Sequence, residues 1–325
     1  MDTDRTAQLS WEKQLILFYD AMKCNMSNWG YINLDGKQRI VFTLLLCVLF
    51  PLINGCSLRS SLTVWATRPL IDGAFLSLMS EPDPDLAKTA MEADLKILEG
   101  LLELRPDDSD LLMKALQGYT GYALLFLEDE HPKRAVKIYQ RARNFGFRIL
   151  AARDERFLSQ DLNYRQFKSI LPSLRENDLP AVYWTSNAWF ASINIQKTPS
   201  SMANIPIAKE MMQWVLDRDP HFFYSGPLWF FGAYYASLPP MLGGSAVKSK
   251  EYFESALEKD GQHFIYGKYL YAKYFATQTL NRDLFLETLE DILNLPENEP
   301  DDLILINRVT QQKSVKLMEQ VDELF

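Results

Sequence analysis

The sequence predicts an all-α protein made of stacked helical hairpins. Beyond Asp83, apolar residues recur at i, i+3, i+4 and i+7, the period of one helix face. One such run comprises Leu95, Leu98, Leu101 and Leu102. No convincing alternation of apolar and polar residues longer than four positions occurs, although a half-buried strand would require it. Helix-ending prolines, which cannot continue the hydrogen-bond ladder, follow three of the periodic runs at Pro106, Pro220 and Pro296.

The N-terminal segment indicates export rather than a folded domain. Residues 1–38 form a leader whose true start is open, because Met26 is a second plausible initiator. Residues 9–22 could alternatively form a short amphipathic helix. Residues 39–55 read as a signal peptide, with a positively charged flank followed by the apolar run 40–53. That run contains a proline and is shorter than the roughly 20 apolar residues of a membrane-spanning helix.

The end of this run resembles a bacterial lipobox, with Ile53 at −3, Gly55 at −1 and Cys56 at +1. The resemblance implies cleavage before Cys56 and attachment of lipid to it. A buried apolar helix with an incidental cysteine is the competing interpretation. Ser57 is not the aspartate that retains lipoproteins at the inner membrane, so a lipid-anchored protein on the periplasmic side of the outer membrane is expected. Residues 56–84 are then a linker and first helix, and residues 85–325 the helical domain.

Spacings in the domain fit a degenerate tetratricopeptide (TPR) repeat of about 34 residues, which packs bulky and small side chains at fixed positions. The best-matching unit contains Tyr119, Tyr122, Ala123, Phe126, Ala135, Tyr139 and Ala142. A later unit contains Leu228, Phe231, Gly232, Tyr235, Ser249, Phe253 and Ala256. Two weaker units begin near Trp184 and Tyr271. A generic helical bundle is the alternative to a TPR-like superhelix.

Composition and motifs disfavour most chemistry. The net charge of −8 argues against a nucleic-acid partner, because phosphates are bound by a surplus of Lys and Arg. Three His and three Cys leave little material for a metal site or a Cys–His pair, and no Gly-rich phosphate loop occurs. We therefore expect no enzyme activity, no metal and no cofactor.

Aromatic and amide side chains give the best candidate for a binding site. Asn187 and Asn194 lie seven residues apart, on one face of an aromatic helix. Amides within apolar walls are typical of a ligand pocket, although a buried Asn bonded to a neighbouring backbone gives the same pattern. The predicted pocket or pore lining is Trp184, Asn187, Trp189, Asn194 and Trp229.

Several of these features together resemble the T component of tripartite ATP-independent periplasmic (TRAP) transporters. They are the lipobox, the TPR-like hairpins, the Trp-rich segment 183–194, the loop 238–244 and the stretch from Ile306 to Phe325. The resemblance implies a periplasm-facing lipoprotein, a homotrimer, and work beside a solute-binding P subunit, with a hydrophobic or organic acid ligand held or channelled. The loop residues expected to contact ligand or partner are Pro239, Pro240, Gly243 and Gly244. A TPR scaffold lipoprotein for envelope assembly, without a small ligand, is the alternative function.

Overall fold

The computed structural model describes residues 56–159, 162–294 and 299–325. The chain divides into two compact units, Met1–Arg59 and Ser60–Phe325, and the second contains the helices discussed below apart from the first turn of α3. The predicted leader and signal peptide lie outside the described residues. Cys56 is the first residue of a helix.

The prediction of an all-α fold is confirmed: the described residues form helices and turns with no strand. The longer helices are α3 (Cys56–Met79), α4 (Pro84–Leu104), α5 (Ser109–Phe126), α6 (Pro132–Ala151), α8 (Leu179–Gln196), α10 (Ile205–Leu216), α11 (Phe222–Ser237), α12 (Ala246–Asp260), α14 (Arg282–Leu293) and α15 (Ile304–Met318). The shorter ones are α7 (Tyr164–Ile170), α9 (Pro199–Met202), α13 (Ile265–Leu270) with the π-helical turn Tyr271–Ala276 after it, and α16 (Val321–Leu324). Short 3₁₀ turns are η1 (Glu155–Leu158), η2 (Leu171–Ser173), η3 (Glu176–Asp178), η4 (Pro240–Leu242) and η6 (Asp301–Leu303).

Local sequence signals set the helix ends. Asp83 caps α4 by accepting the backbone N–H of Asp85 at 3.0 Å, and Asp108 caps α5 by accepting that of Leu111 at 3.2 Å. Pro106 lies two residues beyond the end of α4 and Pro220 lies between α10 and α11, as predicted from their positions in the sequence. Pro296, the third predicted helix stop, lies outside the described residues.

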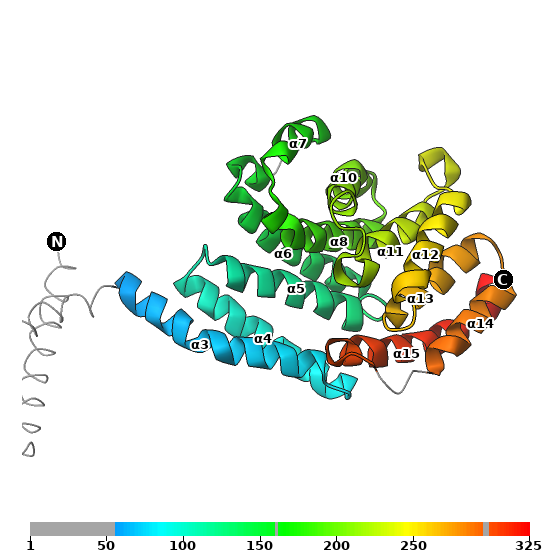
Figure 1. Cartoon of the computed structure of the whole chain (residues 1–325), viewed down its shortest axis with the longest axis horizontal. Coiled ribbons are helices and arrows are strands. Elements are labelled where there is room, and N and C mark those ends of the chain that lie inside the picture. The colour runs from blue at the N-terminus through cyan, green and yellow to red at the C-terminus, as the bar shows by residue number, and fades with distance from the viewer. Residues whose placement is uncertain (1–55, 160–161, 295–298) are drawn as a thin grey trace, which may run out of the picture. The chain divides into compact units, whose positions relative to one another are not determined.

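Helices that are near one another in the chain pack together: α5 on α6, α6 on α8, α8 on α10, and α11 on α12. Small residues let them approach closely, since a Cβ at Gly146 would lie 1.8 Å from the Thr185 hydroxyl. α15 returns from the far end of the chain and lies beside α4 and α5 (Figure 1). Of the positions in the two best repeat units, Phe126 is half-buried and the others are buried, namely Tyr119, Tyr122, Ala123, Ala135, Tyr139, Ala142, Leu228, Phe231, Gly232, Tyr235, Ser249, Phe253 and Ala256.

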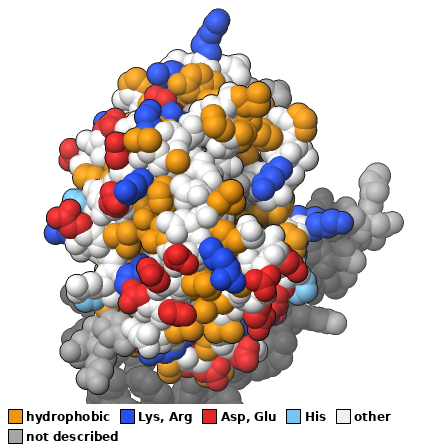
Figure 2. All heavy atoms as spheres, turned by 90° about the vertical axis from the view of Figure 1, so that its right-hand side faces the viewer, with side chains coloured by type: hydrophobic (Ala, Val, Ile, Leu, Met, Phe, Trp, Pro, Cys, Tyr) orange, Lys and Arg blue, Asp and Glu red, His pale blue; other side chains and the backbone are white. Residues whose placement is uncertain are grey.

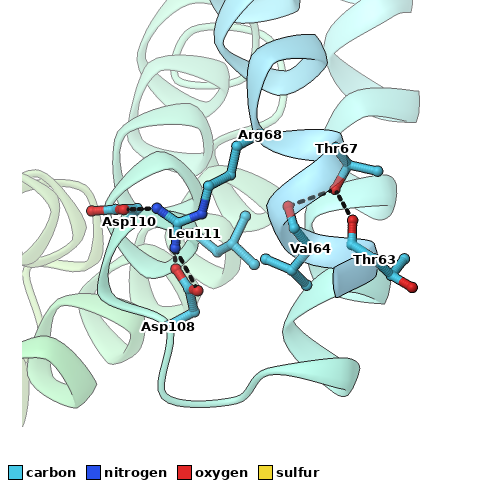
Figure 3. Close-up of polar contacts among 7 residues, drawn as sticks. All are labelled: Thr63, Val64, Thr67, Arg68, Asp108, Asp110 and Leu111. Carbon is cyan, nitrogen blue, oxygen red and sulfur yellow. Dashed lines mark hydrogen bonds and ion pairs between the residues drawn. The ribbon is translucent and has the colours of Figure 1, made fainter. Parts of the chain in front are cut away.

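α3 is attached to α5 by polar and apolar contacts. The Arg68 guanidinium forks between two carboxylates at the start of α5, with 2.8 Å to Asp108 and a second ion pair to Asp110 (Figure 3). Val64 is buried on the same side of α3, in the core that includes Leu111. In the described part of the chain, none of the helices is both long enough and apolar enough for a membrane span.

Candidate functional site

A cavity of about 300 Å³ lies among the helices, at the lower end of the size range of small-molecule sites. Its wall is mainly aromatic and aliphatic. It is built from α3, α4, α5, α6, α8, α11, α13, the π-helical turn and the segment 302–306. Residues from both ends of the domain therefore face the same space. The lining side chains used below are Glu128, Tyr139, Trp184, Asn187, Asn194, Phe223, Trp229, Tyr266 and Tyr274.

α8 contributes a stripe of side chains to the cavity wall. Trp184, Asn187, Ala191 and Asn194 all line the cavity, and their spacing of three or four residues keeps them on one helix face. The Asn187 amide donates to the Tyr183 carbonyl of its own helix at 3.0 Å. The Asn194 amide donates to the Tyr274 hydroxyl at 3.1 Å, which connects α8 with the π-helical turn 80 residues later.

Trp189 is not among the residues that line this cavity. It lies two positions beyond Asn187, which turns it about 200° around the helix at roughly 100° per residue. Its ring is buried against Phe147 in an edge-to-face contact at 5.3 Å, and the Arg143 guanidinium lies 5.2 Å from its centroid. The aromatic density along the sequence, on which the prediction for Trp189 depends, carries no information about the helix face on which a residue lies.

Trp229 lines the cavity and is fixed in place by its neighbours. Its indole N–H donates to the Tyr224 carbonyl at 2.8 Å. The ring packs directly on Gly267, where an added Cβ would lie 2.3 Å from an indole carbon. The Trp229 ring is therefore a rigid part of the wall, because it fills the space beside Gly267 and any larger side chain at position 267 would displace it.

A strained turn opens α11 beside the cavity. Phe223, Tyr224 and Ser225 have φ of 46°, 53° and 59°, a left-handed conformation that costs L-residues about 1–2 kcal/mol each. Ser225 is held by His221 at 2.9 Å and by a hydrogen bond to Asp260. The turn brings the Phe223 ring to 4.8 Å from that of Trp184 and onto the cavity wall. Strain of this kind is typical of functional sites.

The polar part of the wall gathers around Glu128, directly after α5. Burial raises the pKa of the Glu128 carboxyl, and Lys273 and Lys313 offset only part of this. Burial would also raise the pKa of Asp129, but these two lysines bring it below its ordinary value. Asp129 pairs with Lys313 and lies 3.5 Å from the Lys273 amine. Burial, followed by the charge of Glu128, raises the pKa of Tyr139 well above its ordinary value.

Tyr139, Tyr266 and Tyr274 complete this group of side chains, which we name the Glu128 cluster: Glu128, Asp129, Tyr139, Tyr266, Lys273, Tyr274 and Lys313. Burial is the main cause of the raised pKa of Tyr266 and Tyr274, and Glu128 contributes to both. In the sequence, Glu128 belongs to an acidic turn and Tyr139 to a repeat position, so neither stands out. The one local signal is the concentration of tyrosines and lysines between Tyr266 and Tyr274.

The loop of Pro239, Pro240, Gly243 and Gly244 is not part of the cavity wall. Gly243 has a left-handed φ of 95°, and a Cβ at Gly244 would lie 1.8 Å from the Leu238 carbonyl oxygen. Both glycines are therefore needed to form the turn that leads into α12. The turn presents Met241 to solvent with 88% of its surface exposed.

The fold and the site define an all-α protein whose described helices line a mainly apolar cavity with a polar cluster on its wall. Residues 80–325 match the model of the TRAP transporter T-component family, TAtT. The chain therefore belongs to the TRAP transporter T-component family, whose members are accessory components of these transporters. A search of curated proteins finds no match to the chain.

Proposed function

We propose that this chain is a periplasm-facing lipoprotein that holds or channels a hydrophobic or organic acid ligand and docks the solute-binding P subunit of its transporter. The observation that carries the ligand role is the cavity, whose apolar wall would exclude water from an apolar ligand. The Asn187 and Asn194 amides supply oriented polar groups within that wall. Lipid at Cys56 and a homotrimeric state are parts of the same proposal.

We assign the P subunit to the surface around the loop 239–244. Met241, Leu242 and Val247 are exposed large apolar side chains at and just after this loop. A rigid turn that displays apolar side chains to solvent is typical of a contact surface. Figure 2 shows hydrophobic patches separated by acidic and basic groups on the face that it presents.

The ligand role is tested by filling the cavity. Ala191→Phe places a ring in the space between Asn187 and Asn194, whereas Ala93→Phe adds the same ring on the exposed face of α4. Organic extraction and mass spectrometry of the purified full chain should recover a small molecule from wild type and from Ala93→Phe, and much less from Ala191→Phe. Equal recovery from all three proteins, or none from wild type, would favour the scaffold function instead.

Docking is tested separately, with the purified P subunit of the same transporter. Met241→Asp should weaken its binding at least tenfold in a surface plasmon resonance titration, because a charge replaces an apolar contact. Leu280→Asp is the matched control, since Leu280 is an exposed leucine between the π-helical turn and α14. Unchanged binding by Met241→Asp would remove the loop from the docking surface.

A further inference from the structure

The cavity reaches solvent near α3 and the short turn η6. Among the described residues that line the cavity, Leu76 on α3 and Asp302 on η6 are the exposed ones, and the others are half-buried or buried. A lining residue that is open to solvent marks the edge of an opening. We therefore place the mouth of the cavity at Leu76 and Asp302.

The strained turn 223–225 borders this mouth. The Tyr224 hydroxyl donates to the Asp302 carboxylate, with 2.9 Å to either oxygen, so the turn is attached to the exposed edge of the mouth. The neighbouring Phe223 side chain lines the cavity, and its ring lies 4.8 Å from that of Trp184 on α8. Residues 223 and 224 thus connect the edge of the mouth with the inner wall of the cavity.

A second set of hydrogen bonds holds the backbone of this turn in place. The hydroxyl of the buried Ser225 has one proton and donates it to the Asp260 carboxylate, so the 2.9 Å contact with His221 requires an N–H on its Nδ1 atom. The serine of a catalytic triad instead donates to its histidine, so these three residues form a latch and not a nucleophile. The Trp229 indole N–H adds a hydrogen bond to the Tyr224 carbonyl at 2.8 Å.

These hydrogen bonds oppose the strain of the backbone. Three successive residues have positive φ, a conformation that only glycine adopts at no cost. The strain of one such residue corresponds to roughly a five- to thirtyfold shift in an equilibrium. Once the bonds to Asp260 and Asp302 are broken, this strain favours any other conformation of the turn. The turn therefore has a strained, bonded state and a relaxed, free state.

We propose that the turn 223–225 is a gate of the cavity, which the hydrogen bonds to Asp260 and Asp302 keep closed and the left-handed strain favours opening. In the open state Phe223 leaves the wall, and the mouth widens between Asp302 and Trp184. A molecule can then enter or leave without separation of the helices. The role of the gate in holding or channelling a ligand rests on the proposed function, whereas the gate itself requires only the cavity.

The test measures access to the cavity with a small reagent, iodoacetamide. Ala191 lines the cavity, so Ala191→Cys places a thiol on its wall. The protein is the full chain without its native thiols, which are removed by Cys24→Ser, Cys47→Ser and Cys56→Ser. Mass spectrometry of the purified protein gives the rate of alkylation. Ala93→Cys in the same background is the matched control, because residue 93 is exposed on α4.

Three variants change the gate by single groups. Tyr224→Phe removes the hydroxyl that bonds Asp302, and Ser225→Ala removes the one that bonds Asp260. Each should speed alkylation at position 191 about fivefold or more, as loss of a hydrogen bond to a charged group requires, and leave position 93 unchanged. Ser225→Gly removes the same hydroxyl and also the strain, although glycine's freedom in the relaxed turn offsets part of that gain. Its alkylation should be about three- to tenfold slower than that of Ser225→Ala.

The outcomes that overturn the gate are distinct from those that overturn the proposed function. Unchanged alkylation at position 191 in Tyr224→Phe and Ser225→Ala would refute the gate, and so would an equal increase at position 93, which would indicate general loosening of the fold. If Ser225→Gly reacts as fast as Ser225→Ala, strain does not drive the opening. The ligand role is decided separately, by extraction from the Ala191→Phe variant.

Discussion

Replacement of Gly232 by alanine tests how closely α11 and α12 cross. A Cβ at this position would lie 2.7 Å from the Phe253 ring, whereas carbon atoms in contact normally lie about 3.5–4.0 Å apart. Phe253 is fully buried, so its ring has little room to move. The backbone is fixed as well, because the Ser249 hydroxyl donates to the Gly232 carbonyl at 2.8 Å.

The expected loss of stability follows from comparison with Gly100, an exposed glycine in α4. A Cβ added at Gly100 would have no neighbouring atom within 4 Å. Alanine should stabilise either helix by about 0.5–1 kcal/mol relative to glycine. Only Gly232→Ala also overpacks the core, which costs roughly 1–3 kcal/mol. The difference in unfolding free energy between the two variants is therefore expected to be about 1–3 kcal/mol, because the helix-propensity gain cancels.

Urea denaturation followed by circular dichroism at 222 nm measures this difference for the purified full chain. A second variant, Phe253→Leu, leaves space beside residue 232, so it should reduce the penalty of Gly232→Ala when the two are combined. If Gly232→Ala is as stable as Gly100→Ala, the close crossing of α11 and α12 is refuted. If Gly232→Ala lowers the unfolding free energy equally in the wild-type and the Phe253→Leu backgrounds, the clash lies elsewhere.

Three further predictions concern the anchor, the cavity and an ion pair. Cys56→Ala should move the protein from the membrane fraction to the soluble fraction in a cell-fractionation immunoblot; continued membrane attachment would end the lipoprotein proposal. Asn187→Leu should keep the thermal midpoint within a few degrees, since its amide bonds only to its own helix, but should change the amount of extracted ligand; unfolding would assign Asn187 a structural role. The hydrogen bond from Arg156 lowers the pKa of Asp154 to about 2, so any stability from this pair is present above pH 3.8 and lost as pH falls through about 2. An NMR titration of the Asp154 carboxyl should show this midpoint and its rise in Arg156→Ala; an unchanged midpoint would contradict the pairing.

The all-α fold could be predicted because its signals are local. Helix periodicity, caps such as Asp83 and stops such as Pro106 act within a few residues of the structure they determine. The stripe of Asn187 and Asn194 also follows from one helical period, and both residues line the cavity. Trp189 lies outside this wall, because aromatic density along the sequence does not determine the helix face on which a residue lies.

The Glu128 cluster could not be predicted in this way, because its contacts are formed between distant segments. Asp129 and Lys313 are separated by 184 residues, and nothing near either residue indicates the pairing. The raised pKa of Glu128 has the same origin, since burial in the folded chain is its main cause. An acidic residue in a solvated turn and an acidic residue on a cavity wall look the same in the sequence.

The way the cavity wall is distributed along the chain has a consequence for folding. Its lining extends from Phe75 on α3 to Ile306 on α15, so the space does not exist until nearly the whole domain has been synthesised and α15 has docked. Partial opening of either end would release a bound molecule, and such a molecule would in turn resist that opening by mass action. Ligand occupancy is thus a measure of whether the first and last helices are in place, and hydrogen exchange in α3 and α15 should slow together when the cavity is filled.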